Sequence, residues 1–76
     1  MKRRHHDWSG RELEVSRLGS GARVIKTSDG APQNEDGITF HDPFEGRELT
    51  GTVRLATGYF DSQADGIMYQ ITVDVD

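Results

Sequence analysis

The last ten residues, 67–76, alternate between apolar and polar side chains more regularly than any other part of the chain. Their odd positions hold Ile, Tyr, Ile, Val and Val, and their even positions hold Met, Gln, Thr, Asp and Asp. Because successive side chains of a β-strand point to opposite faces, this alternation predicts a strand with one buried face and one wet face. The rest of the chain must pair with this strand or cover its apolar face.

The length and composition of the chain limit it to one small domain. Its 76 residues include no cysteine, so the chain has no disulfide and no thiolate metal ligand. A chain of this length buries only roughly 60–65% of its unfolded surface, so we expect a small margin of stability. No apolar run approaches the ~20 residues of a membrane-spanning helix, and the charged N-terminus is unlike a secretion signal. These features favour a cytoplasmic protein that does not act at a membrane.

The net charge of −4 hides an uneven distribution of charge along the chain. Residues 1–27 hold seven basic and three acidic side chains, whereas residues 28–76 hold two basic and ten acidic ones. The two parts therefore carry net charges of +4 and −8. Such a split can draw the two parts together, present different fields to different partners, or be no more than an uneven solvated surface.

The first eight residues are expected to form a flexible basic N-terminal arm. Residues 2–6 read Lys-Arg-Arg-His-His and offer no apolar side chain for burial, so Trp8 is the first side chain that can anchor the chain. We expect residues 9–76 to form a single small β domain behind this arm.

Residues 9–27 are compatible with two structures. In the first, two short strands flank the Gly-Ser-Gly turn at 19–21, an arrangement typical of a β-hairpin. In the second, a helix at about 10–18 begins after Ser9, with Glu12 at the spacing of a capping box. The three apolar side chains of this segment spread over more than half of a helical wheel and form no compact stripe. The hairpin is therefore favoured.

Three further strands are expected, at residues 37–41, 48–55 and 67–76, separated by turns rich in glycine and aspartate. Gly51 occupies an inward position of the second of these strands, which predicts a bend or bulge there. With the N-terminal hairpin there are five strands, and the simplest architecture is a mainly β, small five-stranded SH3-like or OB-like barrel. The alternative is an α+β domain in which the short helix at about 10–18 packs on an antiparallel sheet. The predicted core comprises Leu13, Val15, Val24, Ile38, Phe40, Leu49, Val53, Leu55, Ile67, Tyr69, Ile71 and Val73.

Two groups of residues have the donor types of a metal site. The nitrogen and carboxylate candidates are His5, His6, His41, Asp7 and Asp42. Two of these histidines lie in the expected N-terminal arm, and the spacing matches no known zinc pattern. Residues 61–66 begin like a calcium-binding loop, but Thr72 stands at the twelfth position, where a bidentate carboxylate is required. We therefore expect no metal and no other cofactor.

The sequence contains no arrangement typical of a catalytic centre. It lacks a cysteine nucleophile, a Gly-x-Ser-x-Gly turn and a Gly-rich phosphate-binding loop. A domain of this size also has little volume for an enclosed substrate pocket. We therefore expect a protein that is not an enzyme.

A basic N-terminal segment beside a tryptophan suggests one mode of binding. Cationic side chains neutralise phosphates, and an exposed aromatic ring stacks on an unpaired base. The net charge of −8 over residues 28–76 opposes the approach of a polyanion, so single-stranded nucleic-acid binding is the alternative function. The residues that it requires are Lys2, Arg3, Arg4, Trp8 and Arg11.

The acidic part of the chain favours a different function. Carboxylates on the polar face of residues 67–76 and in the preceding loop protect an exposed strand from aggregation, and together they also attract a basic partner. These carboxylates are Asp61, Asp65, Asp74 and Asp76. The sequence thus favours a small non-enzymatic module that binds a protein partner, as an inhibitor or adaptor whose acidic surface mimics a nucleic acid. Phage-encoded inhibitors of host nucleic-acid-handling machines are one such class, and a structural subunit of a larger assembly is the second alternative.

Overall fold

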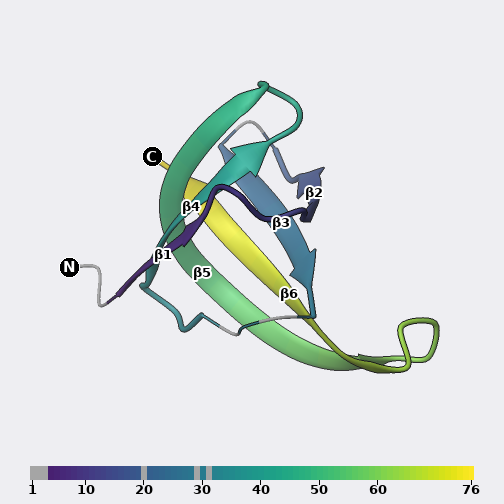
Figure 1. Cartoon of the computed structure of the whole chain (residues 1–76). Coiled ribbons are helices and arrows are strands. Elements are labelled where there is room, and N and C mark those ends of the chain that lie inside the picture. The colour runs from purple at the N-terminus through teal and green to yellow at the C-terminus, as the bar shows by residue number, and fades with distance from the viewer. Residues whose placement is uncertain (1–3, 20, 29, 31) are drawn as a thin grey trace.

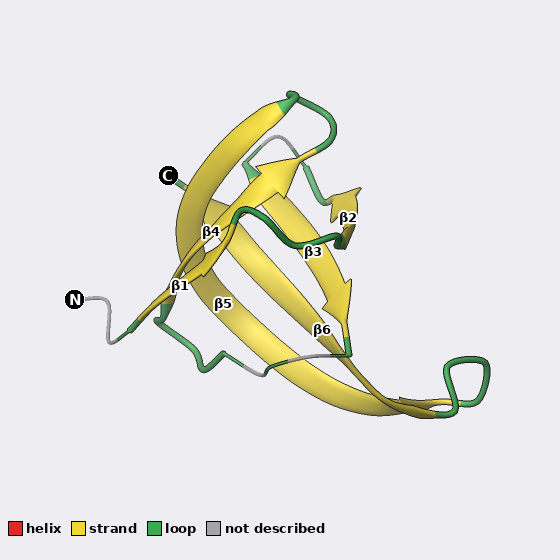
Figure 2. Ribbon diagram, viewed as in Figure 1, coloured by secondary structure: helices red, strands yellow, loops and turns green. Residues whose placement is uncertain are grey.

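A computed structural model describes residues 4–19, 21–28, 30 and 32–76 of the chain (Figure 1). It is built from six strands, and the described residues include no helix (Figure 2), which confirms the mainly β prediction. The described part of the chain accordingly contains no helix that could span a membrane. The strands are β1 (His5–Trp8), β2 (Glu14–Arg17), β3 (Ala22–Thr27), β4 (Gly37–Asp42), β5 (Arg47–Asp61) and β6 (Gly66–Val75).

The six strands form one mixed sheet in the order β1-β4-β5-β6-β3-β2. β1 runs parallel to β4, and every other neighbouring pair is antiparallel. The sheet curls around the core, but the described edge strands β1 and β2 are not paired with each other (Figure 1). The five-stranded SH3-like or OB-like barrel is therefore not confirmed, because the sheet has a sixth strand and stays open.

The N-terminal hairpin is confirmed, and the helix at about 10–18 is wrong. β2 pairs with β3 in a register that sets Val15 opposite Ile25. The Leu18 N–H donates to the Ala22 carbonyl at 3.1 Å where the chain turns, and Ser20 of this turn lies outside the described residues. Pairing satisfies the backbone and packs Val15 against the core, which the scattered apolar positions of a helix could not do.

β1 is the strand that the sequence analysis did not predict. Residues 5–8 of the expected N-terminal arm belong to the sheet, and residues 1–3 lie outside the described part of the chain. Pairing with β4 and the burial of a large side chain hold this strand in place. Trp8 is 6% exposed in the core, and the Gly37 N–H donates to the Arg4 carbonyl at 2.6 Å.

The core lies on the inner face of the curled sheet. Ile71 and Val73 of β6 are fully buried, which confirms the inward face predicted for the middle of that strand. Tyr69 and Val75 are partly buried and pack against the same cluster. The buried apolar side chains are Trp8, Ile25, Ile38, Phe40, Leu49, Val53, Ile71 and Val73.

The face of β3 that packs against the core is the one opposite to the face predicted. Ile25 is fully buried, whereas Val24, a predicted core residue, is only partly buried. The pairing explains the difference, because Ile25 lies opposite Val15 and Ile71, whose side chains face the core. A shift of one residue in a strand exchanges its two faces.

A β-bulge in β5 exchanges the faces of its second half. Val53 pairs with Val73 but Leu55 pairs with Thr72, so Arg54 is the extra residue. Leu55 is consequently 53% exposed on the outer face, and its assignment to the core is wrong. The alternation of side chains does not continue across a bulge, where two residues of one strand oppose one of the other.

Gly51 is required by the close approach of β6 to β5. A Cβ atom at this position would lie 2.7 Å from Val73 Cγ1 and would also contact the carbonyl oxygen of Asp74. The irregularity predicted at Gly51 is thus found at Arg54, and the glycine itself lets the two strands lie close together.

β5 and β6 extend beyond the rest of the sheet as a hairpin arm, residues 55–70 (Figure 1). Within the described sheet, β4 pairs with β5 only as far as Thr52, and β3 pairs with β6 only as far as Tyr69. The outer part of the hairpin arm therefore has no described third strand beside it. Figures 1 and 2 show it projecting from the sheet at the lower right.

Candidate functional site

The hairpin arm carries large apolar side chains that are open to solvent. Leu55, Phe60 and Ile67 are 53%, 65% and 52% exposed. Fully burying such a side chain is worth about 1.5–3 kcal/mol, so leaving three of them on one projecting element is unfavourable for the isolated domain. Single exposed apolar residues are ordinary, whereas a group on one element is typical of an interaction site.

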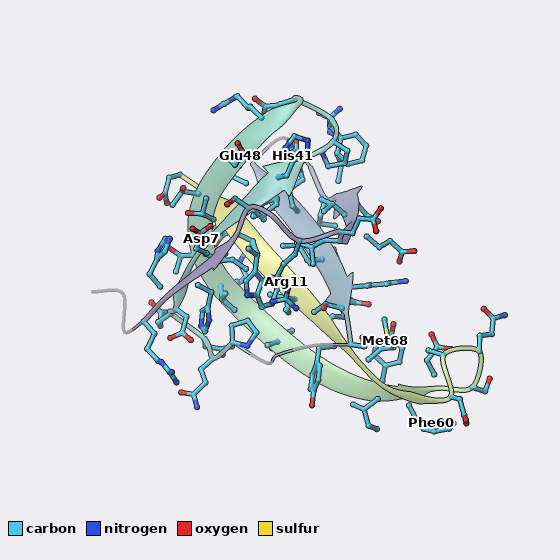
Figure 3. All side chains as sticks on the ribbon, viewed as in Figure 1. Asp7, Arg11, His41, Glu48, Phe60 and Met68 are labelled. Atoms are coloured by element: carbon cyan, nitrogen blue, oxygen red, sulfur yellow. The ribbon has the colours of Figure 1, made fainter. Side chains whose placement is uncertain are left out.

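The two faces of the hairpin arm have different surroundings. On the inner face Phe60 lies opposite Ile67, and this pair continues the line of Ile71 from the core into solvent. Ile67 was predicted to be a core residue, and it is exposed because no described strand or loop covers this part of the arm. On the outer face Tyr59 lies opposite Met68, and Figure 3 shows Met68 and Phe60 on opposite sides of the ribbon.

The aromatic ring of Tyr69 covers the one glycine in the middle of the hairpin arm. A Cβ atom at Gly58 would lie 3.1 Å from Tyr69 Cε1, so the ring packs directly over the backbone of the opposite strand. An aromatic side chain placed across from a glycine stabilises a hairpin in this way. The arm is therefore an ordered element that presents Phe60 and Ile67 at fixed positions.

The tip of the hairpin arm is acidic. Asp61 Oδ1 accepts hydrogen bonds from the backbone N–H of Gln63 at 2.9 Å and of Ala64 at 3.5 Å, which shapes the turn. Asp65 follows with a φ of 54°. Residues 55–76 contain no Lys, Arg or His, so the arm carries no cation of its own to neutralise these carboxylates.

The structure places the other two predicted carboxylates at the opposite end of β6. Asp74 is bound by Arg54, with its Oδ1 2.8 Å from Nη2 and its Oδ2 3.1 Å from Nε. Asp74 lies eight positions after Gly66 along the extended strand, which is roughly 27 Å at ~3.4 Å per residue. Asp61 and Asp65 therefore form one acidic group, at the tip of the arm, and Asp74 and Asp76 lie apart from it.

The Trp8 ring that the alternative nucleic-acid site requires for stacking is not accessible. Trp8 is buried, and the Arg11 guanidinium lies 4.2 Å from the centre of its ring. A base cannot reach a ring face that the core and a guanidinium already cover. Arg4 is exposed, while Lys2 and Arg3 lie outside the described residues.

The histidines and aspartates weighed as metal ligands are dispersed and engaged in separate contacts. His5 Nε2 lies 2.9 Å from Thr39 Oγ1, and His41 Nδ1 lies 2.7 Å from Glu48 Oε2. His6 Nε2 lies 2.9 Å from Asp36 Oδ2. Across the described residues no three His, Asp or Glu side chains converge, and no cavity for a ligand is found.

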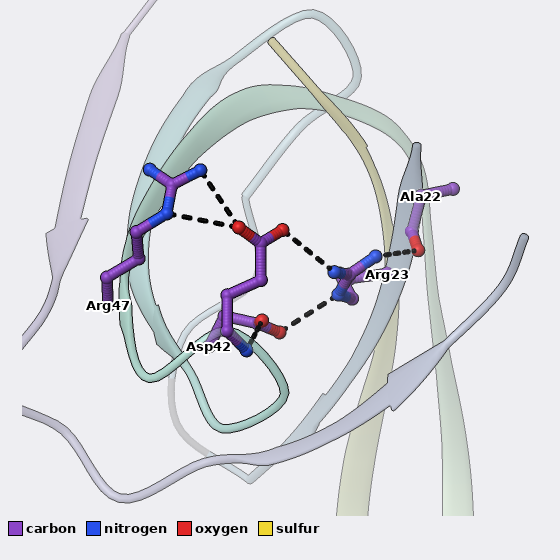
Figure 4. Close-up of polar contacts among 5 residues, drawn as sticks. Ala22, Arg23, Asp42 and Arg47 are labelled. Atoms are coloured by element: carbon purple, nitrogen blue, oxygen red, sulfur yellow. Dashed lines mark hydrogen bonds and ion pairs between the residues drawn. The ribbon is translucent and has the colours of Figure 1, made fainter. Parts of the chain in front are cut away.

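Asp42 belongs to a buried ion pair that the sequence analysis missed (Figure 4). Its Oδ1 accepts a hydrogen bond from Arg23 Nε at 2.9 Å, and both side chains are almost completely buried. Its Oδ2 accepts the N–H of Glu45 at 2.7 Å. Since β3 and β4 are not neighbours in the sheet, this pair joins two strands across the interior.

Two opposing effects act on the ionisation of Asp42. Burial raises the pKa of its carboxyl, but the hydrogen bonds from Arg23 and from the Glu45 N–H, together with the charge of Arg23, outweigh burial. The pKa of Asp42 is therefore held below its ordinary 3.8. The pair has a structural role, closing the interior at the end of the sheet opposite the hairpin arm.

The residues of the hairpin arm were missed because residues 58–66 read as a loop. The signal that could have found them is the symmetry around the turn, where Tyr-Phe-Asp at 59–61 and Gly-Ile-Met at 66–68 flank four small or polar residues. Two apolar runs at that separation are typical of a hairpin. Comparisons of the chain with protein-family models, with curated proteins and with solved structures found no match.

Proposed function

We propose that this chain is a small protein-binding module whose binding element is the hairpin arm. The observation that supports the proposal is the exposure of Phe60 and Ile67 side by side on an ordered hairpin that projects from the sheet. Such an element packs against an apolar surface of a partner and buries the apolar area that the isolated domain leaves in water. Binding of this kind needs no catalytic group and no cofactor.

The acidic tip supports a particular chemistry for the partner. Asp61 and Asp65 lie beside the apolar pair of the arm, so a partner surface that combines apolar and basic side chains complements both features. Opposite charges also speed the encounter of the two proteins. We favour an adaptor or an inhibitor that docks by this arm. Its carboxylates then contact the basic side chains of the partner.

The test compares capture by the wild-type chain with capture by two variants. The arm variant carries Phe60→Ser and Ile67→Ser, and the control variant carries Ser16→Ala, an exposed change on the distant strand β2. We expect the wild type and the control to retain the same protein from an extract of the source cells and the arm variant to lose it. Equal retention by all three proteins would contradict the proposal, provided that circular dichroism shows the arm variant folded.

A further inference from the structure

A second exposed apolar surface lies at the end of the sheet opposite the hairpin arm. Phe44, in the turn between β4 and β5, is 51% exposed. The Arg17 and Arg23 guanidinium carbons lie 5.8 Å and 5.7 Å from the centre of its ring. Arg17 and Arg23 are partners across β2 and β3, so both reach the ring from the same side of the sheet. We call this group the Phe44 surface, and it consists of Phe44, Arg17, Arg23, Asp42, Glu45 and Arg47.

The Phe44 surface carries a net positive charge. Arg23 is matched by Asp42, and Glu45 is bound by Arg47 at 2.9 Å. The exposed Arg17 is the third guanidinium, so three cations face two carboxylates. The nearby Glu48 is bound to His41 on the outer face of the sheet.

The two exposed surfaces are complementary but lie too far apart to meet within one copy. β5 begins at Arg47, beside the Phe44 surface, and ends at Asp61, at the tip of the hairpin arm. Figure 1 shows the β4–β5 turn and the tip of the arm at opposite ends of the molecule. One surface combines apolar side chains with carboxylates, and the other combines an apolar ring with guanidiniums. A contact between them therefore requires two copies of the chain.

We propose that the hairpin arm of one copy binds the Phe44 surface of a second copy, head to tail. Phe60 and Ile67 then pack beside Phe44, and the carboxylates of the tip approach Arg17. This inference rests on the arm being a protein-binding element, and it names its partner as the chain itself. Because the two surfaces differ, each copy keeps one of them free, and the contact repeats into a ring or an open chain.

Two variants and their mixture test the inference in solution. The arm variant is Phe60→Ser with Ile67→Ser, and the surface variant is Phe44→Ser with Arg17→Ser. Mass is measured by light scattering after gel filtration from about 1 µM to about 1 mM, the range in which weak protein contacts become populated. We expect the wild type to exceed the monomer mass of 8.5 kDa as concentration rises, and each variant alone to stay at it.

The mixture gives the decisive result. The surface variant keeps its arm and the arm variant keeps its Phe44 surface, so together they form one contact and stop at a one-to-one dimer. In each variant alone, the Kd for self-association should rise at least roughly ten-fold, so that each stays at the monomer mass where the wild type assembles. If the surface variant assembles like the wild type, the arms bind each other and the inference is wrong.

Failure of this inference is distinguishable from failure of the protein-binding function. If the wild type stays at its monomer mass throughout, or the mixture stays as two monomers, the head-to-tail contact is excluded. Capture of a different protein that depends on Phe60 and Ile67 would then leave the proposed function standing. Unchanged circular dichroism and unfolding midpoints in both variants ensure that lost assembly reflects a lost surface.

Discussion

The replacement Gly51→Ala tests how closely β5 and β6 approach each other. The added methyl group would lie 2.7 Å from Val73 Cγ1 and would contact the backbone carbonyl of Asp74. The carbonyl cannot move without disturbing the pairs that join Gly51 to Val75 and Thr52 to Asp74. Inserting a methyl group into a filled core costs about 1–3 kcal/mol, and replacing glycine by alanine returns about 0.5–1 kcal/mol of backbone entropy.

We therefore expect Gly51→Ala to lower the free energy of unfolding by about 1–2 kcal/mol, measured by urea denaturation. For a domain of this size, that is a fall of roughly 4–16 °C in the melting temperature. Gly10→Ala is the matched control, because no atom lies within 4 Å of a Cβ there. Equal stability of Gly51→Ala and Gly10→Ala would show that β6 does not pass Gly51 as closely as described.

Three further perturbations have expected outcomes. Arg23→Met leaves the buried carboxylate of Asp42 without its partner, so urea denaturation should show a loss of about 3–5 kcal/mol, and a loss below about 1 kcal/mol would contradict the buried pair. The pKa values of Asp36 and Asp42 lie below 3.8 in the folded protein, and for Asp36 the cause is the hydrogen bonds from His6 and the Gln33 N–H. The contribution of these two carboxylates to the free energy of unfolding is therefore present above pH 3.8 and is lost as the pH falls through the lowered values. The urea midpoint should therefore drop on acidification below pH 3.8, and it should drop less in Asp42→Asn. Ile71→Ala should cost about 2–4 kcal/mol because the side chain is fully buried, whereas Phe60→Ser should stay within about 0.5 kcal/mol; equal losses would place Phe60 in the core.

The sequence predicted the strands best where one face is fully buried. Ile71 and Val73 follow the alternation of residues 67–76, and the core on the other side of them selects that face. The prediction that Leu55 lies in the core is wrong because the bulge at Arg54 is set by the pairing with β6, and no local sequence pattern indicates it. Local pattern determines a strand, but its register depends on a neighbour that is distant in the chain.

Two other features could not be foreseen from local chemistry. Asp42 was considered only as a possible metal ligand, because nothing near it in the sequence indicates that Arg23 reaches it across the interior. β1 was interpreted as part of a flexible N-terminal arm, since two histidines and an aspartate outnumber its single buried side chain, Trp8. In both cases a tertiary contact decides the structure.

The candidate site was predicted in part. The sequence pattern indicates Asp61 and Asp65 as binding residues, and both lie at the tip of the hairpin arm. It did not name Phe60, and it placed Ile67 in the core, because exposure depends on which neighbouring strands end early. Whether a side chain is covered is a property of the whole sheet and not of its own strand.

The central claim is that the hairpin arm contacts another protein through Phe60. Its most direct test is photo-crosslinking in the source cells, with p-benzoylphenylalanine in place of Phe60 and, as the control, in place of Ser16 on β2. A discrete crosslinked product of defined mass is expected from position 60, and none from position 16. No product from position 60, or the same products from both positions, would contradict the claim.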